Sequence, residues 1–204
     1  MKKSAKLKIP KYRTIEQNID KIDRPYRGIC HRILEDNRQL FETVQGSTHN
    51  HQTWPGGYID HITDAMNLVR PLYKFFRKFG RALPFTRSDA LLVVFLHDVE
   101  KPWRIELDSA GNAKNRTRLE TKEQFKIFRE QKLVEYGLVL PPALQNAFTY
   151  IEGEHKAYSD KRRVMNELAA FCHLVDTWCA RGWYAYPKAE ADEWTGAGRI
   201  RTTT

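Results

Sequence analysis

Apolar residues recur at helical spacing along most of this 204-residue chain. The seven-residue run Ala90–Leu96 predicts a buried helix that starts with Thr86 or Ser88 as its N-cap and ends at His97-Asp98, before Pro102. No convincing run of alternating strands is present. The pattern therefore predicts an all-α, single-domain helical bundle. The other expected helices cover 28–45, 58–79 (with Pro71 as a point of kinking or splitting), 120–136, 141–153 and 160–183.

Charge divides the chain into three parts. The net charge is +9, but six basic residues and no acid lie within residues 1–13, which leaves 28 basic and 25 acidic residues elsewhere. We expect a basic N-terminal arm over 1–25, a helical domain over 26–184 and a loosely ordered tail over 185–204. The arm has two open interpretations, contact with phosphates or RNA and simple solubility.

Several classes of protein are disfavoured. No apolar run reaches the roughly 18 residues of a membrane span, and no apolar segment follows the N-terminal charges as in a signal peptide. The three cysteines, Cys30, Cys172 and Cys179, do not form a disulfide framework, so we expect reduced, structural thiols. A cytoplasmic protein that does not bind membranes is the expectation.

The candidate chemistry centres on the adjacent His97 and Asp98. His61 and Asp176 lie in other expected helices, and a carboxylate rarely enters an apolar helix face without a partner. Imidazole and carboxylate together suit a divalent ion such as Mn, Fe, Ni, Co, Zn or Mg. Each residue also has an ordinary interpretation. His61 could be a hydrogen-bonded histidine, His97 a helix C-cap, and Asp176 the partner of Arg163 or Arg181, while His173 competes as a ligand.

Two motifs carry a resemblance to a known family. The segment His51-Gln-Thr-Trp-Pro-Gly-Gly-Tyr-Ile-Asp-His61 resembles the first metal-ligand motif of the HD superfamily of phosphohydrolases. Phe95-Leu-His-Asp-Val-Glu-Lys101 is similar to the His-Asp doublet of that family with its trailing lysine. Asp176, within His-Leu-Val-Asp-Thr, is similar to the final aspartate. The resemblance covers roughly residues 29–183.

The resemblance implies an all-helical, metal-dependent phosphohydrolase. Its metal ligands carry over as His61, His97, Asp98 and Asp176, and Lys101 matches a lysine that neutralises a substrate phosphate. His51 is similar to a histidine found in the branch that includes 3′–5′ exoribonuclease-like members. Binuclear members have two further histidines between the doublet and the last aspartate. Here His155 supplies one, and no histidine between 99 and 154 supplies the other. One ion is therefore expected and a second is open.

The residues themselves indicate roles in hydrolysis. Lys101 and Arg104 would offset negative charge on a phosphoryl group, and Asp98 would bridge metal and water. Glu100 or His155 would serve as general base or hold a second ion. Trp54 and Tyr58 would either stack on a base or cover the helix start, and we place His51, Trp54, Lys101 and Arg104 at the substrate.

Two functions from different classes follow. The first is hydrolysis of a nucleotide-type phosphoester by a nucleotide phosphatase, nucleoside polyphosphate hydrolase, phosphodiesterase or nuclease, with a nucleotide or nucleic-acid phosphate as substrate. The alternative is a nucleic-acid-binding or regulatory module that retains a structural metal. An interaction protein without metal requires the ligand spacing to be a coincidence. The sequence predicts no oligomeric state.

Overall fold

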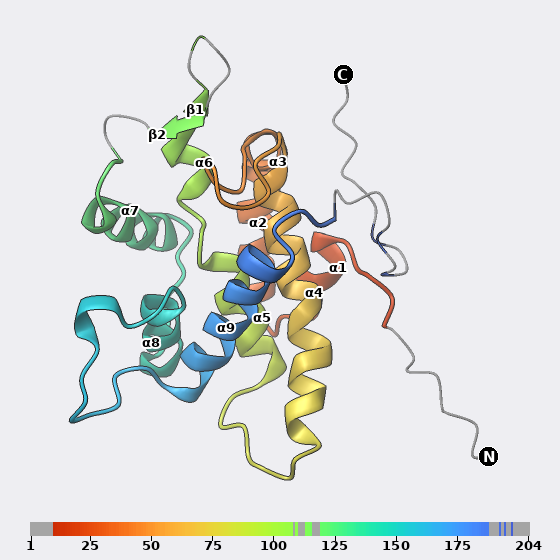
Figure 1. Cartoon of the computed structure of the whole chain (residues 1–204), viewed down its shortest axis with the longest axis vertical. Coiled ribbons are helices and arrows are strands. Elements are labelled where there is room, and N and C mark those ends of the chain that lie inside the picture. Colours follow the sequence, from red (N-terminus) through yellow and green to blue (C-terminus); the bar gives the residue numbers. More distant parts are fainter. Residues whose placement is uncertain are drawn as a thin grey trace.

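The computed structural model describes residues 10–107, 109, 113–115, 119–187, 192, 194 and 197. This part of the chain is mainly helical, which confirms the predicted all-α class (Figure 1). Its elements are α1 (Ile15–Ile19), α2 (Tyr26–Asp36), α3 (Arg38–Thr43), α4 (Gly57–Arg77), α5 (Arg87–Leu96), α6 (Lys101–Arg104), β1 (Ile105–Leu107), β2 (Ala113–Asn115), α7 (Lys122–Glu135), α8 (Pro142–Tyr150), the 3-10 helix η1 (His155–Ala157), α9 (Glu167–Thr177) and the π-helical turn η2 (Trp178–Gly182).

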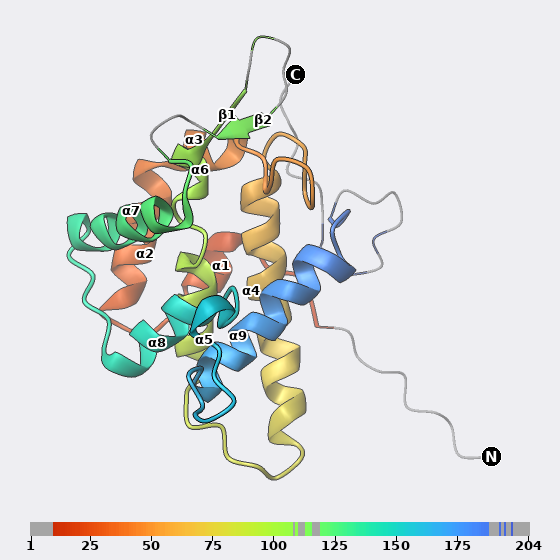
Figure 2. The same cartoon turned by 60° about the vertical axis from the view of Figure 1, so that its left-hand side comes forward.

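The core forms where α4, α5 and α9 meet. Helix α5 is apolar on every side, so it is stable only with other helices around it, and residues 90–96 are at most 2% exposed. Helix α9 crosses α4 and α5, and α8 packs against α9 on the other side (Figure 2). Each apolar side chain buried here contributes about 1.5–3 kcal/mol relative to exposure. This packing fixes the ends of α5 and α9 relative to the start of α4.

Two helix boundaries differ from the sequence prediction because asparagines interrupt the pattern. The helix expected over 28–45 is divided at Asn37, whose side-chain amide donates to the Ile33 carbonyl at 2.8 Å and so competes with the backbone. The helix expected from 160 begins only at Glu167, because the Asn166 side chain caps it by accepting from the Ala169 amide at 2.8 Å. Helix α4, in contrast, continues through Pro71.

The segment after the His-Asp doublet contains a short hairpin that the sequence does not reveal. Strands β1 and β2 pair antiparallel, with Ile105 opposite Asn115 and Leu107 opposite Ala113. Each strand has three residues, too few for an alternating pattern to stand out from a loop.

Part of the expected N-terminal arm belongs to the core. Thr14 forms a capping box with Gln17 at the start of α1, and Ile15, Ile19 and Ile22 are buried. The Tyr12 hydroxyl donates to the Asp64 carboxylate on α4 at 2.5 Å. The helical unit therefore begins before residue 26. Residues 1–9 of the expected arm, and most of the tail from residue 188 on, lie outside the described residues.

The three cysteines are free and buried, in agreement with the expectation of structural thiols. Burial raises the pKa of all three thiols, Cys30, Cys172 and Cys179, above the usual value. Across the described ranges, no helix is both long enough and apolar enough to cross a bilayer.

Candidate metal centre

Two glycines position His61 at the start of α4. Gly56 adopts a left-handed conformation with φ of 77°, which glycine reaches without strain. A side chain at Gly57 would collide with the backbone carbonyl of Gln52, so only glycine permits this close approach. The loop before α4 therefore packs directly on the helix, and the His51 ring lies 4.6 Å, centroid to centroid, from the ring of His61.

The end of α5 positions His97 and Asp98. A capping box between Thr86 and Asp89 starts this helix, as the sequence predicts, and His97 follows its last residue. The His97 Nδ1–H donates to the Val94 carbonyl at 2.7 Å. That hydrogen bond selects the tautomer and directs Nε2 toward the cluster, as is usual for metal-binding histidines.

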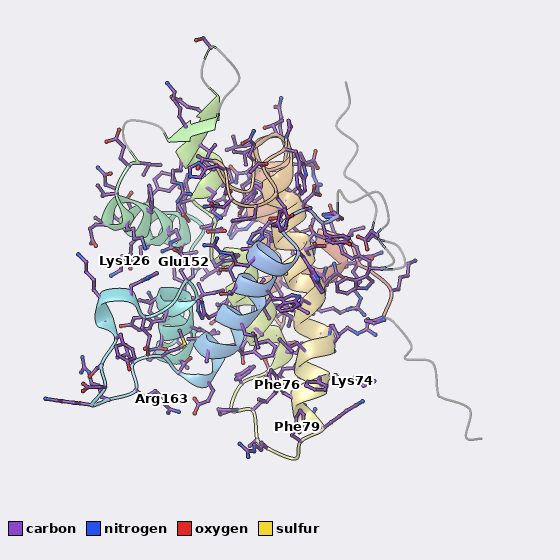
Figure 3. The ribbon with its side chains drawn as sticks, viewed as in Figure 1. Lys74, Phe76, Phe79, Lys126, Glu152 and Arg163 are labelled. Carbon is purple, nitrogen blue, oxygen red and sulfur yellow. The ribbon has the colours of Figure 1, made fainter. Side chains whose placement is uncertain are left out.

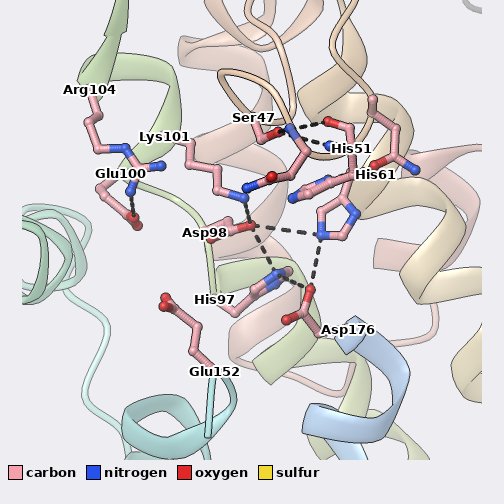
Figure 4. A network of polar contacts seen from close by, with 12 residues as sticks. Ser47, His51, His61, His97, Asp98, Glu100, Lys101, Arg104, Glu152 and Asp176 are labelled. Carbon is pink, nitrogen blue, oxygen red and sulfur yellow. Dashed lines mark hydrogen bonds and ion pairs between the residues drawn. The ribbon is translucent and has the colours of Figure 1, made fainter. Parts of the chain in front are cut away.

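Four predicted ligands converge at this point (Figure 4). The Nε2 atoms of His61 and His97 lie 3.1 and 3.3 Å from Oδ1 of Asp176. Oδ2 of Asp98 lies 3.1 Å from Nε2 of His97 and 3.8 Å from Nε2 of His61. The candidate ligand atoms of His61, His97 and Asp176 all lie within 4.8 Å of one another. Residues 115 positions apart in sequence thus share one buried cluster.

Several ionisable groups lie close together in this buried cluster, and each changes the pKa of the others. Burial would raise the pKa of Asp98, but the positive charges of His97 and Lys101 lower it well below its usual value. Burial likewise opposes charge on His97, yet Asp98 and Asp176 outweigh it and raise the pKa of His97. Burial lowers the pKa of His61. Burial would also raise the pKa of Asp176, but His97 and His61 outweigh burial and lower it, so both carboxylates are anionic and attract a cation.

The donor atoms fit a divalent metal. Nε2 of His97 is buried and lies 3.1 Å from the Asp98 carboxylate and 3.3 Å from the Asp176 carboxylate. A metal ion that replaced the proton on this nitrogen would join His97 to both carboxylates, because a histidine ligand must be deprotonated. Two imidazole nitrogens with carboxylate oxygens suit first-row transition metals better than Mg, because Mg prefers oxygen ligands. Asp98 and Asp176 can each supply one oxygen.

A polar pocket of about 460 Å³ opens beside the cluster. Asp98, Lys101, Arg104, Asp176 and His51 line it, so five of the predicted site residues share one cavity. Nζ of Lys101 lies 2.5 Å from Oδ2 of Asp98, which ties this cation to the cluster. The Arg104 guanidinium lies 4.3 Å from the centroid of the Phe125 ring. Lys101 and Arg104 thus face the same space as Asp98 and Asp176, and the exposed Arg181 also lines it.

Other predicted site residues lie elsewhere. The Trp54 indole donates to Asp60 at 2.7 Å and does not line the pocket, and Tyr58 is buried against Phe41. Neither ring lines this pocket, so the geometry favours the other interpretation, in which both cover the start of α4. His155 is exposed in η1 and also lies outside the pocket lining. The sequence alone does not predict where these side chains point, because each orientation depends on how a loop folds.

Glu100 points away from the pocket into an ion-pair cluster (Figure 4). Its carboxylate lies 3.7 Å from Arg129 and 3.5 Å from Arg104, and it is 1% exposed. Burial, only partly offset by Arg129, raises the pKa of Glu100 to about 7. Glu100 therefore does not line the pocket in which the sequence places a general base or a second ion.

Glu152 and Arg129 belong to the site but were not predicted, and His173, which the sequence offers as a competing ligand, lies in the pocket lining. Glu152 and His173 line the pocket, and the His173 ring bonds to the Ile151 carbonyl at 2.6 Å. Arg129 of α7 donates to the His97 carbonyl at 2.6 Å and to Glu152 at 2.8 Å. In the sequence Arg129 resembles any solvated cation on an amphipathic helix, so no signal marks it. His173 stands one turn before Asp176, and that spacing is the signal available for it.

No family model, no curated protein and no solved structure matches the chain. The function is therefore argued from the geometry of the site.

Proposed function

We propose that this chain is a metal-dependent phosphohydrolase of the HD type, acting on a nucleotide-type phosphate ester or anhydride. The observation that supports it is the convergence of His61, His97, Asp98 and Asp176 beside a pocket that is lined by Lys101, Arg104 and Arg181. Packing alone does not favour this arrangement, because four polar side chains gathered in a buried cluster lose hydration that apolar side chains at the same positions would not lose.

The chain's own residues would bind the phosphate. Lys101 and Arg104 line the pocket, and both are already held in place, by Asp98 and Phe125 respectively. Cations fixed before substrate arrives stabilise developing negative charge without reorganisation. His61, His97, Asp98 and Asp176 would hold the ion, which when bound supplies Lewis acidity and a more acidic water.

His51 has a different role from the two cations. Burial, His61 and Lys101 lower the pKa of His51 to about 3, so the ring is neutral at neutral pH. Its Nδ1–H donates to the Gln52 amide oxygen at 2.6 Å, which leaves Nε2 as an acceptor. We propose that His51 accepts a hydrogen bond from a substrate hydroxyl or a water and does not neutralise phosphate.

We propose one bound ion. The Glu152 carboxylate, a possible ligand for a second ion, is already paired with Arg129 at 2.8 Å. The nucleotide character of the substrate and the cytoplasmic location remain predictions from sequence.

Metal analysis of protein purified without chelator tests the proposal. We expect one transition-metal ion per chain, and metal-stimulated release of phosphate or nucleotide from a panel of nucleotides and oligonucleotides. His97→Asn should abolish metal retention and reduce turnover at least about 100-fold, because even partners that only orient a ligand contribute 10–100-fold. His49→Asn, at an exposed histidine of the neighbouring loop, is the matched control and should leave both unchanged.

Two outcomes would contradict the proposal. A folded wild-type protein that retains no metal and releases nothing from any substrate with Mn, Co, Ni, Zn or Mg added excludes the hydrolase. Bound metal without turnover, with oligonucleotide binding unchanged in a folded Asp98→Ala variant, favours the alternative of a binding module with a structural metal. Circular dichroism establishes that each variant is folded.

A further inference from the structure

The C-terminal end of α4 carries an unusual concentration of positive charge. Residues 65–88 contain six basic residues and no Asp or Glu. Those basic residues are Arg70, Lys74, Arg77, Lys78, Arg81 and Arg87. Lys74, Arg77, Lys78 and Arg81 are exposed. We call the exposed residues Lys74, Phe75, Arg77, Lys78, Phe79 and Arg81 the α4 tip. Figure 3 labels Lys74 and Phe79 of this group.

No carboxylate of the described residues pairs with the positive charges here. Within the described ranges, none of the six basic residues of 65–88 forms an ion pair with a carboxylate. Arg38, Arg129 and Arg163 elsewhere all do. Arg13 adds a further cation beside α4, because its backbone exchanges hydrogen bonds of 2.8 Å with the side chain of Asn67, one turn before Arg70. Such a surface attracts a polyanion.

The α4 tip also exposes two aromatic rings. Phe75 is 53% and Phe79 62% exposed, and their ring centroids lie 5.0 Å apart. Phe76, between them in sequence, instead contacts the core residue Phe171, with centroids 6.1 Å apart. Phe75 and Phe79 thus form an apolar surface that the fold itself does not cover, directly beside the cations.

We propose that the α4 tip binds single-stranded nucleic acid. Cations that follow a backbone, together with exposed aromatic rings, are the combination by which proteins bind single strands irrespective of sequence. Arg70, Lys74 and Lys78 recur about once per helical turn and cover about 12 Å along the axis, so they offer a linear track to successive phosphates. Phe75 and Phe79 would stack on unpaired bases, whose faces a duplex hides.

An anionic bilayer is the competing partner for this surface, and the distribution of the cations along the helix disfavours it. A planar surface would touch only the end of α4, whereas the cations continue along the side of the helix to Arg70 and to Arg13, which contacts Asn67 of α4. A linear polyanion can contact all of them.

This binding does not depend on the metal centre. Phe75 follows His61 by 14 residues in the same helix, about 21 Å along its axis. Binding to the α4 tip can therefore be measured in the presence of a chelator, and loss of hydrolysis would not affect it. Failure of the proposed hydrolase and failure of this inference are thus separate results.

Fluorescence anisotropy of the full chain, with a labelled oligothymidylate of about 16 nucleotides and EDTA, provides the test. The triple variant Lys74→Glu, Arg77→Glu, Lys78→Glu should weaken binding at least about tenfold more than its control. It should also reduce the slope of log K against log salt by about 2, because each lost single-strand phosphate contact contributes about 0.7. The control, Lys156→Glu, Lys161→Glu, Arg162→Glu, changes the same charge at exposed positions elsewhere.

A second variant tests stacking without changing charge. Phe75→Ala with Phe79→Ala should weaken binding about tenfold, whereas Val134→Ala with Val139→Ala, at residues 77% and 82% exposed, should not. The proposal is overturned if the wild-type protein does not bind the oligonucleotide, or if both charge variants lose the same affinity. It is also overturned if the phenylalanine variant loses no affinity. Unchanged oligonucleotide binding with lost binding to phosphatidylserine vesicles would assign the α4 tip to membranes instead. Should the charge variant fail to fold, the phenylalanine pair decides.

Discussion

At His97, one backbone hydrogen bond determines which ring nitrogen faces the metal cluster. The Val94 carbonyl accepts from Nδ1, so Nε2 remains for a ligand. The backbone of His97 is held as well, because the buried guanidinium of Arg129 donates to its carbonyl. Burial opposes the charge on Arg129, but Glu100 and Glu152 outweigh it and raise the pKa of Arg129, which keeps it cationic.

Replacing Arg129 should therefore weaken metal binding without removing a ligand. We expect Arg129→Gln to reduce metal affinity by about 10–100-fold, the usual effect of residues that orient metal ligands. Isothermal titration with Co or Mn measures it. Arg163→Gln, which breaks an exposed ion pair with Glu167, is the matched control and should leave affinity unchanged. Equal affinities in the two variants would show that Arg129 serves packing only.

The site could be predicted from sequence only in part. His61, His97, Asp98 and Asp176 stand out because polar ligand types interrupt apolar helices, and they do converge. The positions of Trp54, Glu100 and His155 depend on loop paths and on distant partners such as Asp60 and Arg129, which no local pattern encodes.

At the scale of the element, short polar residues limited what the hydrophobic pattern could predict. Helical spacing identified α4, α5, α7, α8 and α9, whereas Asn37 and Asn166 changed helix boundaries through side-chain hydrogen bonds. The turn before α4 depends on glycine in a further way, because Gly57 lies against the backbone of Gln52.

A pair of glycine variants measures that dependence. Gly57→Ala should destabilise the protein by about 1–3 kcal/mol or more, because the loop carrying His51 must move away from α4. Gly28→Ala, in α2 with no neighbouring atom within 4 Å of the added methyl, should stabilise by up to about 1 kcal/mol. Urea denaturation of both variants checks these signs, and a neutral result for Gly57→Ala would contradict the close approach.

At the scale of the whole molecule, the segment before α1 closes one side of the bundle. The backbone of Arg13 exchanges hydrogen bonds of 2.8 Å with the Asn67 side chain, and the Trp194 indole donates to the Pro10 carbonyl at 2.6 Å. Sequence could not reveal this, because lysines dominate the composition of residues 1–13. Tyr12 and Asp64 form the buried centre of this contact.

Stability should therefore depend on the ionisation of Asp64. Burial raises the pKa of Asp64 to about 7, so the folded state favours its protonated form. Between about pH 4 and pH 7 the unfolded chain releases this proton and the folded chain retains it. Stability thus falls as pH rises, by about 1.4 kcal/mol for each unit by which the pKa is raised. Denaturation curves recorded across this pH range give the free energy of unfolding. Asp64→Asn should remove this fall in stability, whereas Asp160→Asn, at an exposed site, should retain it.

The burial of Cys30, Cys172 and Cys179 makes the molecule suited to site-specific labelling. With their thiols shielded from solvent and protonated, native cysteines should react slowly with maleimides. A single cysteine introduced at exposed Ala82 would then carry a fluorophore with little background. The native cysteines can likewise stay in place when a label is attached at any other exposed position.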